Sequence, residues 1–315
     1  MRVLRGRPST WAPNGASRAI AVGVFDGVHL GHRHVLGVLR ERAAVSGLEP
    51  GVLTFDPHPL AVVIPQRAPA MLTGLGHRIE LLGGLGVELV AVLEFDDAVR
   101  GWSPATFVTE TIAGALAAEL VVVGEDFRFG RDRTGHVGLL REMGTALGFE
   151  TEVVPLVGED SPVSSTRIRE MIAAGDMTGA ASALGRPHEL WGEVVAGEGR
   201  GRSIGIPTAN LAIPRGMAVP AAGVYAATAG RSADEALPAV VNIGTRPTFD
   251  GEGITVEAHL LDFDEDLYGG TLRLRFIARI RDERRFETAE TLVEQIHRDI
   301  AQARALFGGA ATADS

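Results

Sequence analysis

The stretch Ala19-Ile-Ala-Val-Gly-Val-Phe25, followed directly by Asp26-Gly-Val-His-Leu-Gly-His32, carries the strongest fold signal of the chain. Its first part is short, apolar and without strict alternation, which is typical of a strand buried on both faces of a parallel sheet. We expect this strand to end at 23–25 and a helix to begin near Gly31 or His32. The stretch therefore predicts a strand, a glycine-rich turn and a helix in direct succession.

Four more apolar segments of the same kind follow, separated by segments in which apolar residues recur at helical spacing. We expect strands at 51–55, 89–95, 120–124 and 151–157, and helices at 32–46, 104–117 and 135–148. This alternation predicts a doubly wound α/β domain, in which ligands bind at the carboxyl ends of the parallel strands.

The pattern changes after about residue 184, where short β-rich segments are separated by turns rich in Gly, Pro and Asp. We expect strands at 191–198, 223–229, 237–244, 255–263 and 271–281. The segment Leu272-Arg-Leu-Arg-Phe-Ile-Ala-Arg279 alternates with period two, as does a strand with one face in a core. We predict a small antiparallel barrel or sandwich with a C-terminal helix at 288–306. The predicted domains are 1–184 and 185–308, followed by a disordered tail at 309–315.

The composition excludes several classes of protein. The 315-residue chain carries a formal net charge of −10, has no cysteine, and has only arginine among its 30 basic residues. A net negative charge disfavours a broad nucleic-acid-binding surface. The lack of cysteine excludes disulfides and thiolate chemistry, and the lack of lysine excludes a Walker A loop and Schiff-base chemistry. An ATP-using enzyme of this composition must rely on arginine, histidine, backbone amides and metal ions.

No apolar run is long enough to span a bilayer, since the run near 112–123 is interrupted by Glu119. Three arginines near the N-terminus suggest a signal peptide, but Trp11-Ala-Pro-Asn-Gly15 stands where its apolar stretch should lie. We therefore expect a cytoplasmic protein with neither a membrane nor a nucleic acid as its partner. The sequence does not reveal the oligomeric state.

The turn after the first strand is the first candidate site. His29 and His32 are three residues apart, so both imidazoles can face one ligand, and the helix N-terminus adds amide donors for a phosphate. Together they could stabilise charge on an α-phosphate as pyrophosphate leaves, without a protein nucleophile. Gly23, Gly27 and Gly31 would let the backbone approach a nucleotide closely.

Two other interpretations of these histidines exist: a pair of ordinary surface residues, or a metal site completed by His34 and His58. The glycines and the strand before them favour nucleotidyl transfer. His29-Leu-Gly-His32 resembles the HxGH signature of the nucleotidyltransferase superfamily, within the longer form GxFDGxHxGH. The candidate catalytic residues are the two histidines, and the candidate nucleotide contacts are Gly23, Phe25, Asp26, Gly27 and Gly31.

Three further segments follow predicted strands and extend the resemblance: Thr54-Phe-Asp-Pro-His-Pro59, Gly124-Glu-Asp-Phe-Arg-Phe-Gly130 and Ser164-Ser-Thr-Arg-Ile-Arg169. Alone, the last is equally well explained as a helix N-cap. Together they resemble the FMN adenylyltransferase module of bacterial bifunctional riboflavin kinase/FAD synthetases. Family members differ at Asp126, where some have Asn, and near Pro162, where some have a basic residue. The candidates are Ser165, Thr166 and Arg169 for phosphate, and Asp56, His58, Asp126 and Phe127 for flavin.

A second candidate site begins with the glycine-rich segment Gly197-Glu-Gly-Arg-Gly-Arg-Ser-Ile-Gly-Ile-Pro-Thr-Ala-Asn210. Gly199 and Arg202 are candidates for a phosphate cradle. Thr208 and Asn210 offer neutral oxygen ligands suited to Mg²⁺. Taken alone, the segment could equally be a flexible hairpin loop.

Glu257 alternates with apolar neighbours, so its side chain must point to the opposite face of its strand, where it could accept a proton from a hydroxyl. An exposed strand glutamate is the alternative. The segments PTAN at 207–210, NIGTRPTF at 242–249, VEAHLLDF at 256–263 and LYG at 267–269 resemble the riboflavin kinase domain. The resemblance implies that Thr208 and Asn210 bind metal and ATP phosphates, and that Glu257 is the base acting on the ribityl 5′-hydroxyl.

We therefore expect a bifunctional transferase that uses ATP and Mg²⁺ to convert riboflavin into FMN and then FMN into FAD. Three alternatives remain: an enzyme with one decayed domain, a flavin carrier without turnover, and an adenylyl- or cytidylyltransferase for another phosphate ester.

Overall fold

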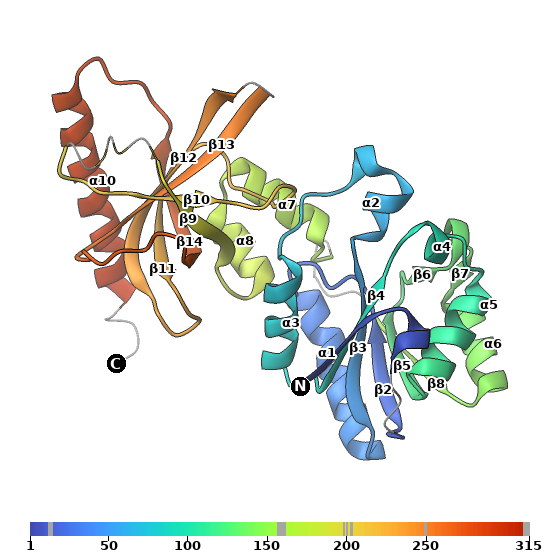
Figure 1. Ribbon diagram of the computed structural model, residues 1–315. Coiled ribbons are helices and arrows are strands. Elements are labelled where there is room, and N and C mark those ends of the chain that lie inside the picture. The colour runs from blue at the N-terminus through green and yellow to red at the C-terminus, as the bar shows by residue number, and fades with distance from the viewer. Residues whose placement is uncertain are drawn as a thin grey trace. The chain divides into compact units, whose positions relative to one another are not determined.

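The computed structural model describes residues 1–11, 15–155, 162–197, 199, 201, 204–248 and 251–310. The chain forms two compact units, Met1–Ser165 and Thr166–Ser315 (Figure 1). The first is an α/β unit and the second is a β-barrel with helices.

The first unit contains a parallel sheet of six strands in the order β1-β4-β3-β2-β5-β8. β2 lies between β3 and β5, so the strand order reverses between β2 and β5. Ligands of open α/β sheets bind at such a reversal, beyond the carboxyl ends of the strands. The strands are β1 (Arg2–Gly6), β2 (Arg18–Val22), β3 (Glu49–Asp56), β4 (Leu89–Glu94), β5 (Ala118–Gly124) and β8 (Glu150–Val154).

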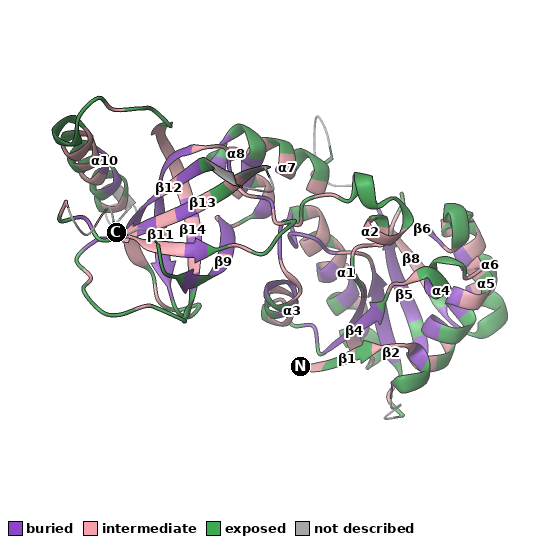
Figure 2. Cartoon of the chain, turned by 45° about the horizontal axis from the view of Figure 1, so that its top comes forward, coloured by how far each residue is buried: buried purple, intermediate pink, exposed green. Residues whose placement is uncertain are grey.

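Both faces of this sheet are covered. Alternate residues of β2 enter opposite cores, with Ile20 and Val22 on one side and Ala19 and Ala21 on the other. Figure 2 shows the buried residues concentrated in the strands of both units. The α-helices of this unit are α1 (Leu30–Ser46), α2 (Pro59–Val63), α3 (Leu75–Gly84), α4 (Asp97–Arg100), α5 (Pro104–Phe107) and α6 (Val137–Leu147). It also contains the π-helix η3 (Val108–Ala115) and the short 3-10 helices η1 (Pro8–Thr10), η2 (Pro65–Arg67) and η4 (Arg131–Arg133). A two-stranded ribbon is formed by β6 (Arg128–Phe129) and β7 (Gly135–His136).

The second unit contains a closed antiparallel barrel in the order β10-β13-β12-β11-β14-β9. Its helix α10 packs on β11, β12 and β14, and Ala303 of α10 is buried against Val224, Val240 and Leu261. The elements are α7 (Ser165–Ala174), α8 (Met177–Leu184), β9 (His188–Val195), β10 (Ala209–Ala212), β11 (Gly223–Gly230), β12 (Leu237–Thr248), β13 (Gly251–Leu260), β14 (Thr271–Asp282) and α10 (Ala289–Ala310).

The fold class predicted from the sequence is confirmed, and several boundaries need correction. β2 ends at Val22 rather than at 23–25, because Phe25 and Val28 have φ of 53° and 42°, which no strand contains. β8 ends at Val154, and residues 156–157 of the predicted strand lie outside the described part of the chain. The π-helix replaces much of the helix predicted at 104–117. β1, α3 and β10 were not predicted.

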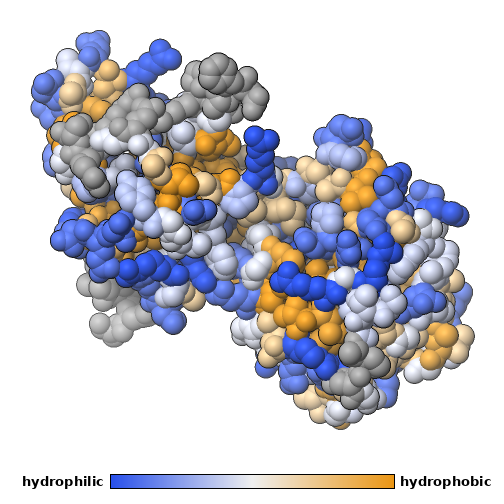
Figure 3. Space-filling model, viewed as in Figure 1, coloured by the Kyte–Doolittle hydropathy of each residue, from blue (hydrophilic) through white to orange (hydrophobic). Residues whose placement is uncertain are grey.

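The C-terminal helix runs to Ala310, so residues 309–310 of the predicted disordered tail are helical. Residues 311–315 lie outside the described residues. The helices α7 and α8 group with the barrel, whereas the sequence placed them with the α/β domain. Polar side chains cover much of the face in Figure 3. No helix in the described part of the chain has the length and apolar character needed to cross a membrane.

Candidate active sites

The turn between β2 and α1 places both predicted histidines at the start of a helix. His29 is the N-cap of α1, and its Nδ1 accepts a hydrogen bond from the backbone N–H of His32 at 3.4 Å. Because Nδ1 accepts, the neutral ring carries its proton on Nε2. The His29 ring therefore caps the helix with one nitrogen and has the other as a donor.

The two imidazoles stack on each other, with ring centroids 3.7 Å apart and planes inclined by 19°. The Phe25 ring packs against His32, and the centroids of these two rings are 5.1 Å apart. Gly31 makes room for this arrangement, since a Cβ there would lie 3.2 Å from the His29 ring. Within the described residues, the buried Nδ1 of His32 has no hydrogen-bond partner. Unsatisfied buried polar atoms are rare in folded proteins, and a bound ligand is one partner that could satisfy this nitrogen.

Burial lowers the pKa of His32 well below its usual range, and the neighbouring His29 and Arg78 lower it further. We expect His32 to remain neutral at pH 6, where an ordinary histidine with a pKa of about 6.5 is mostly charged. Ring ¹H–¹⁵N spectra recorded across pH 5–8, with His32→Gln used for assignment, measure this. A midpoint at or above about 6.5 would contradict the expected burial. Because folding lowers this pKa, His32 takes up its proton first in the unfolded chain as pH falls below about 6.5, and this uptake reduces the stability of the native state.

The turn between β2 and α1 has a strained backbone, and hydrogen bonds from other segments of the chain hold it in place. Phe25 and Val28 have positive φ although neither is glycine, and each such residue costs on the order of 1–3 kcal/mol. The buried Asp26 carboxylate accepts hydrogen bonds from the backbone amides of Leu72 and Thr73, at 2.9 and 3.1 Å. Asp26, which the sequence placed among the nucleotide contacts, thus braces the turn through its carboxylate.

The backbone carbonyls of the turn are also held. Thr54 Oγ1 and Arg78 Nη1 both donate to the Val24 carbonyl, each at 2.9 Å. Ser165 Oγ donates to the Asp26 carbonyl at 3.0 Å. Arg78 and the 72–73 segment were not predicted to take part, because they belong to no motif and only the fold brings them to the turn.

A cavity of about 360 Å³ opens above the histidines, between the ends of β2, β5 and β8. Of the predicted residues it is lined by Gly23, Phe25, His29, Gly31, His32, Asp126, Phe127 and Ser165. Pro162 also lines it, so both positions at which the family pattern varies face this cavity. The Phe127 ring stacks on Phe129 at 5.3 Å, which supports it as a flat apolar wall.

The remaining candidates of this domain lie elsewhere. Gly27 is buried and donates its N–H to Thr73 Oγ1 at 3.1 Å. Asp56 is exposed at the end of β3, and His58 caps α2 by accepting from the Leu60 N–H at 3.1 Å. Thr166 and Arg169 belong to α7 in the second unit, and their part in this site stays a prediction.

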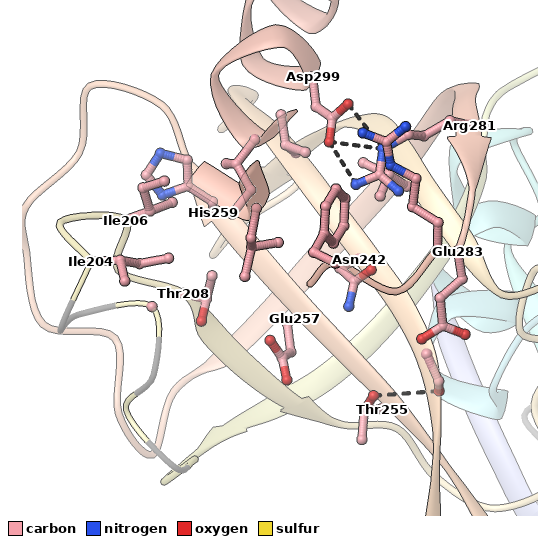
Figure 4. Close-up of a pocket in the computed structure, with 18 of the residues that line it drawn as sticks. Ile204, Ile206, Thr208, Asn242, Thr255, Glu257, His259, Arg281, Glu283 and Asp299 are labelled. Carbon is pink, nitrogen blue, oxygen red and sulfur yellow. Dashed lines mark hydrogen bonds and ion pairs between the residues drawn. The ribbon is translucent and has the colours of Figure 1, made fainter. Parts of the chain in front are cut away.

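The barrel unit has a cavity of about 410 Å³ between its outer face and α10. Glu257 of β13 faces this cavity near Thr208 and Asn242 (Figure 4). Its neighbours Val256 and Ala258 are buried, as the alternation predicts. Glu257 is paired in register with Asn210 of β10 and with Asn242 of β12, so the three side chains share one face of the barrel.

The wall opposite Glu257 is apolar and comes largely from residues that the sequence did not assign. Phe286, Leu292 and Ile296 line it, together with Asp299. Asp299 is 2% exposed and accepts a two-pronged hydrogen bond from Arg281, with Nε–Oδ1 at 3.0 Å and Nη2–Oδ2 at 2.9 Å. This ion pair fastens α10 to β14 at the edge of the cavity (Figure 4).

Thr208 and Asn210 are positioned by close backbone contacts. His259 Nδ1 donates to the Pro207 carbonyl at 2.7 Å, which joins β13 to the residue before Thr208. A Cβ on Gly197 would lie 2.2 Å from the Asn210 side-chain amide, so a larger residue there would displace that amide. Gly199 has a φ of +69° and does not line the cavity, and Arg202 lies outside the described residues.

A second barrel cavity of about 600 Å³ shares Thr208 with the first. It is lined by Pro207, Ala209 and the segment from Phe263 to Tyr268, which includes Leu267 and Tyr268 of the LYG motif. Glu257 and His259 line the first cavity, whereas Ala258 and Leu260 line the second, so the two cavities lie on opposite faces of β13.

Comparison with known proteins identifies the family. Residues 12–167 match the family model for FAD synthetase, and residues 184–307 match the model for riboflavin kinase. The bifunctional riboflavin kinase/FMN adenylyltransferase of Pseudomonas fluorescens is 39% identical over 308 residues, which cover 97% of this chain and 98% of the relative. The chain belongs to this bifunctional family. The resemblance inferred from the sequence motifs is thereby confirmed.

Other riboflavin kinase/FMN adenylyltransferases match equally fully. The Escherichia coli (strain K12) protein is 36% identical over 309 residues, 98% of each chain. A solved structure titled "Macrolide-efflux Protein from Streptococcus pneumoniae" has a TM-score of 0.87 and 31% identity, covering 96% of this chain and 98% of that chain. This likeness extends over both units of the fold.

Proposed function

We propose that the barrel unit phosphorylates riboflavin to FMN and that the α/β unit then adenylylates FMN to FAD, each with its own ATP. The observation that carries the proposal is the pairing of two sites in one chain. One is a histidine stack at the switch point of a parallel sheet. The other is Glu257, which faces a barrel cavity that Thr208 also lines and which is paired in register with Asn210.

For the kinase step, we place riboflavin in the apolar cavity under α10 and ATP in the second cavity, with the reacting groups near Thr208. The riboflavin 5′-oxygen attacks the γ-phosphorus, the bond from that phosphorus to the β–γ bridging oxygen breaks, and ADP leaves. Glu257 accepts the hydroxyl proton. Phe286, Leu292 and Ile296 exclude water from one wall of the site.

For the adenylyl step, an FMN phosphate oxygen attacks the α-phosphorus of ATP, and the bond to the α–β bridging oxygen breaks so that pyrophosphate leaves. His29 donates from Nε2 to a phosphate oxygen, and the backbone amides at the start of α1 bind phosphate charge. Because burial lowers the pKa of His32 well below its usual range, this ring contributes to the step as a neutral imidazole.

Mg²⁺ fits the barrel site by the chemistry of its donors. The Thr208 hydroxyl, the Asn210 amide oxygen and the nearby Glu257 carboxylate are oxygen ligands of the kind that Mg²⁺ prefers, with the remaining places taken by water and phosphates. The described residues contain no group of three or more His, Cys, Asp or Glu side chains placed to hold a metal. A bound Mg²⁺ would neutralise polyphosphate charge in both reactions.

Gly197→Ala is expected to raise the Mg²⁺ and ATP concentrations needed for half-maximal FMN formation about tenfold, because the added Cβ displaces the Asn210 amide. A tenfold change corresponds to about 1.4 kcal/mol of binding free energy. Titration of riboflavin phosphorylation with MgCl₂ measures the effect. Gly308→Ala is the control, since Gly308 lies near the end of α10 and has nothing within 4 Å of the new Cβ. Equal shifts in the two variants would remove Asn210 from the metal site.

The function itself is tested by incubating the full chain with riboflavin, ATP and Mg²⁺ and separating the products chromatographically. We expect FMN to appear first and FAD to follow with release of pyrophosphate. Accumulation of FMN alone would remove the adenylyltransferase half of the proposal, and no turnover would favour a flavin carrier. The cytoplasmic location remains a prediction, as does a domain boundary near residue 184, which differs from the division into compact units after Ser165.

A further inference from the structure

Arg78 lies beneath the histidine turn and belongs to none of the sequence motifs. It is on α3 and only 1% of its surface is exposed. Its Nη1 donates to the Val24 carbonyl at 2.9 Å, and its Nη2 donates to the Phe55 carbonyl at 3.3 Å. One guanidinium therefore joins the chain leaving β2 to the end of β3.

The Val24 carbonyl is the critical acceptor, because the next residue is Phe25, with its φ of 53°. Phe25 is buried and packs against the His32 ring, which in turn stacks on His29. A shift of the Val24 carbonyl would thus be passed through Phe25 to both imidazoles.

The guanidinium also acts through its charge. Burial lowers the pKa of Arg78, while the nearby Asp26 and Asp56 carboxylates raise it. The charged and titratable groups that act on His32 among the described residues are His29 and Arg78, and both disfavour protonation of its ring. A guanidinium is costly to desolvate, so the burial of Arg78 at this place calls for hydrogen-bond and charge partners, which the turn and the two carboxylates supply.

We propose that Arg78 is a positioning residue of the adenylyl-transfer site, because its planar fork fixes the strained turn that carries His29 and His32. The inference rests on the proposed FMN adenylyltransferase function and adds to it a residue that does not line the cavity. Turnover of FMN and ATP by the unaltered chain tests the function, and variants of Arg78 test the inference.

The main variant is Arg78→Met, which keeps the length of the side chain and removes both hydrogen bonds and the charge. We expect kcat for FAD formation from FMN to fall about 10- to 100-fold, as is typical when reacting groups are misplaced by about an ångström. KM for FMN and for ATP should change less than threefold. Riboflavin phosphorylation by the same preparation should stay within twofold, since the kinase residues lie in the other unit.

The second readout is the titration of His32. Its midpoint should rise in Arg78→Met and stay in place in Arg78→Lys, which retains the charge but lacks the two-pronged fork. Arg78→Lys should still lose at least fivefold in kcat for FAD formation. The matched control is Arg141→Met on α6, where the arginine is exposed, and it should change neither activity nor titration.

Three results would overturn the inference. The first is an adenylyl kcat within twofold of the unaltered chain in folded Arg78→Met. The second is an unchanged kcat with raised KM values, which would make Arg78 a binding residue. If Arg78→Met does not fold, Arg78→Lys decides, and a kcat within twofold would show that the fork is not needed.

Discussion

Replacing His29 by alanine is expected to lower the rate of FAD formation from FMN about 10²–10³-fold, the loss typical when one preorganised donor is removed from a developing negative charge. The ring stacks on His32, lines the cavity and has Nε2 as its donor. FMN formation from riboflavin should be unaffected. Each step is measured with its own substrate, FMN or riboflavin, by chromatography of the flavins.

Alanine also removes the N-cap of α1, which costs about 1 kcal/mol of stability. His29→Asn separates the two roles, because asparagine caps helices well but lacks the imidazole. We expect His29→Asn to be as stable as the native chain in thermal unfolding and as inactive as the alanine variant in adenylyl transfer. Activity restored by asparagine would assign His29 a structural role only.

Glu257→Gln is expected to lower riboflavin phosphorylation about 10²–10⁴-fold, because glutamine cannot accept the 5′-hydroxyl proton. The substitution preserves side-chain size, and Glu257 is partly exposed at a cavity rather than buried in the core. Adenylylation of supplied FMN should be unaffected. The measurement is the initial rate of FMN formation at saturating ATP and Mg²⁺.

Glu193→Gln is the matched control, since Glu193 is an exposed glutamate on β9 of the same barrel and lines neither barrel cavity. It should leave both activities within twofold. A similar loss in Glu193→Gln and Glu257→Gln would indicate that the charge of the barrel matters rather than a base. If either His29→Ala or Glu257→Gln stopped both steps equally in folded protein, the assignment of separate sites would be wrong.

Much of the architecture could be predicted, because the spacing of apolar residues along a short segment indicates which of its faces are buried. Continuous apolar runs indicated strands covered on both faces, and the alternation around Glu257 indicated a strand with two unlike faces. The two strands β1 and β10, which were not predicted, lack such a pattern. β1 is a five-residue segment at the sheet edge that contains Arg2 and Arg5, and β10 has only four residues, so each is stabilised mainly by pairing with distant strands.

The residues of the two candidate sites likewise fall into those that the sequence indicated and those that only the fold revealed. Motif residues such as His29, Thr208 and Glu257 could be chosen from the sequence, because their chemistry and spacing are local. Asp26 was also chosen, but only the fold shows its carboxylate bound to the amides of Leu72 and Thr73. The apolar wall from α10 was missed, because its amphipathic pattern is explained equally well by packing on the barrel.

The sequence alone therefore determined the family, the two-unit order and the chemical groups at the histidine turn. Tertiary structure decided what holds that turn in its strained form and which protonation state its buried imidazole adopts. Arg78 is 54 residues from Val24 in the chain, yet it donates to the Val24 carbonyl. Such contacts depend on how distant segments pack, and neither residue types nor spacing within a motif records that packing. Desolvation likewise follows from the surrounding fold, so the lowered pKa of His32 is a property of the folded unit and not of the HxGH motif.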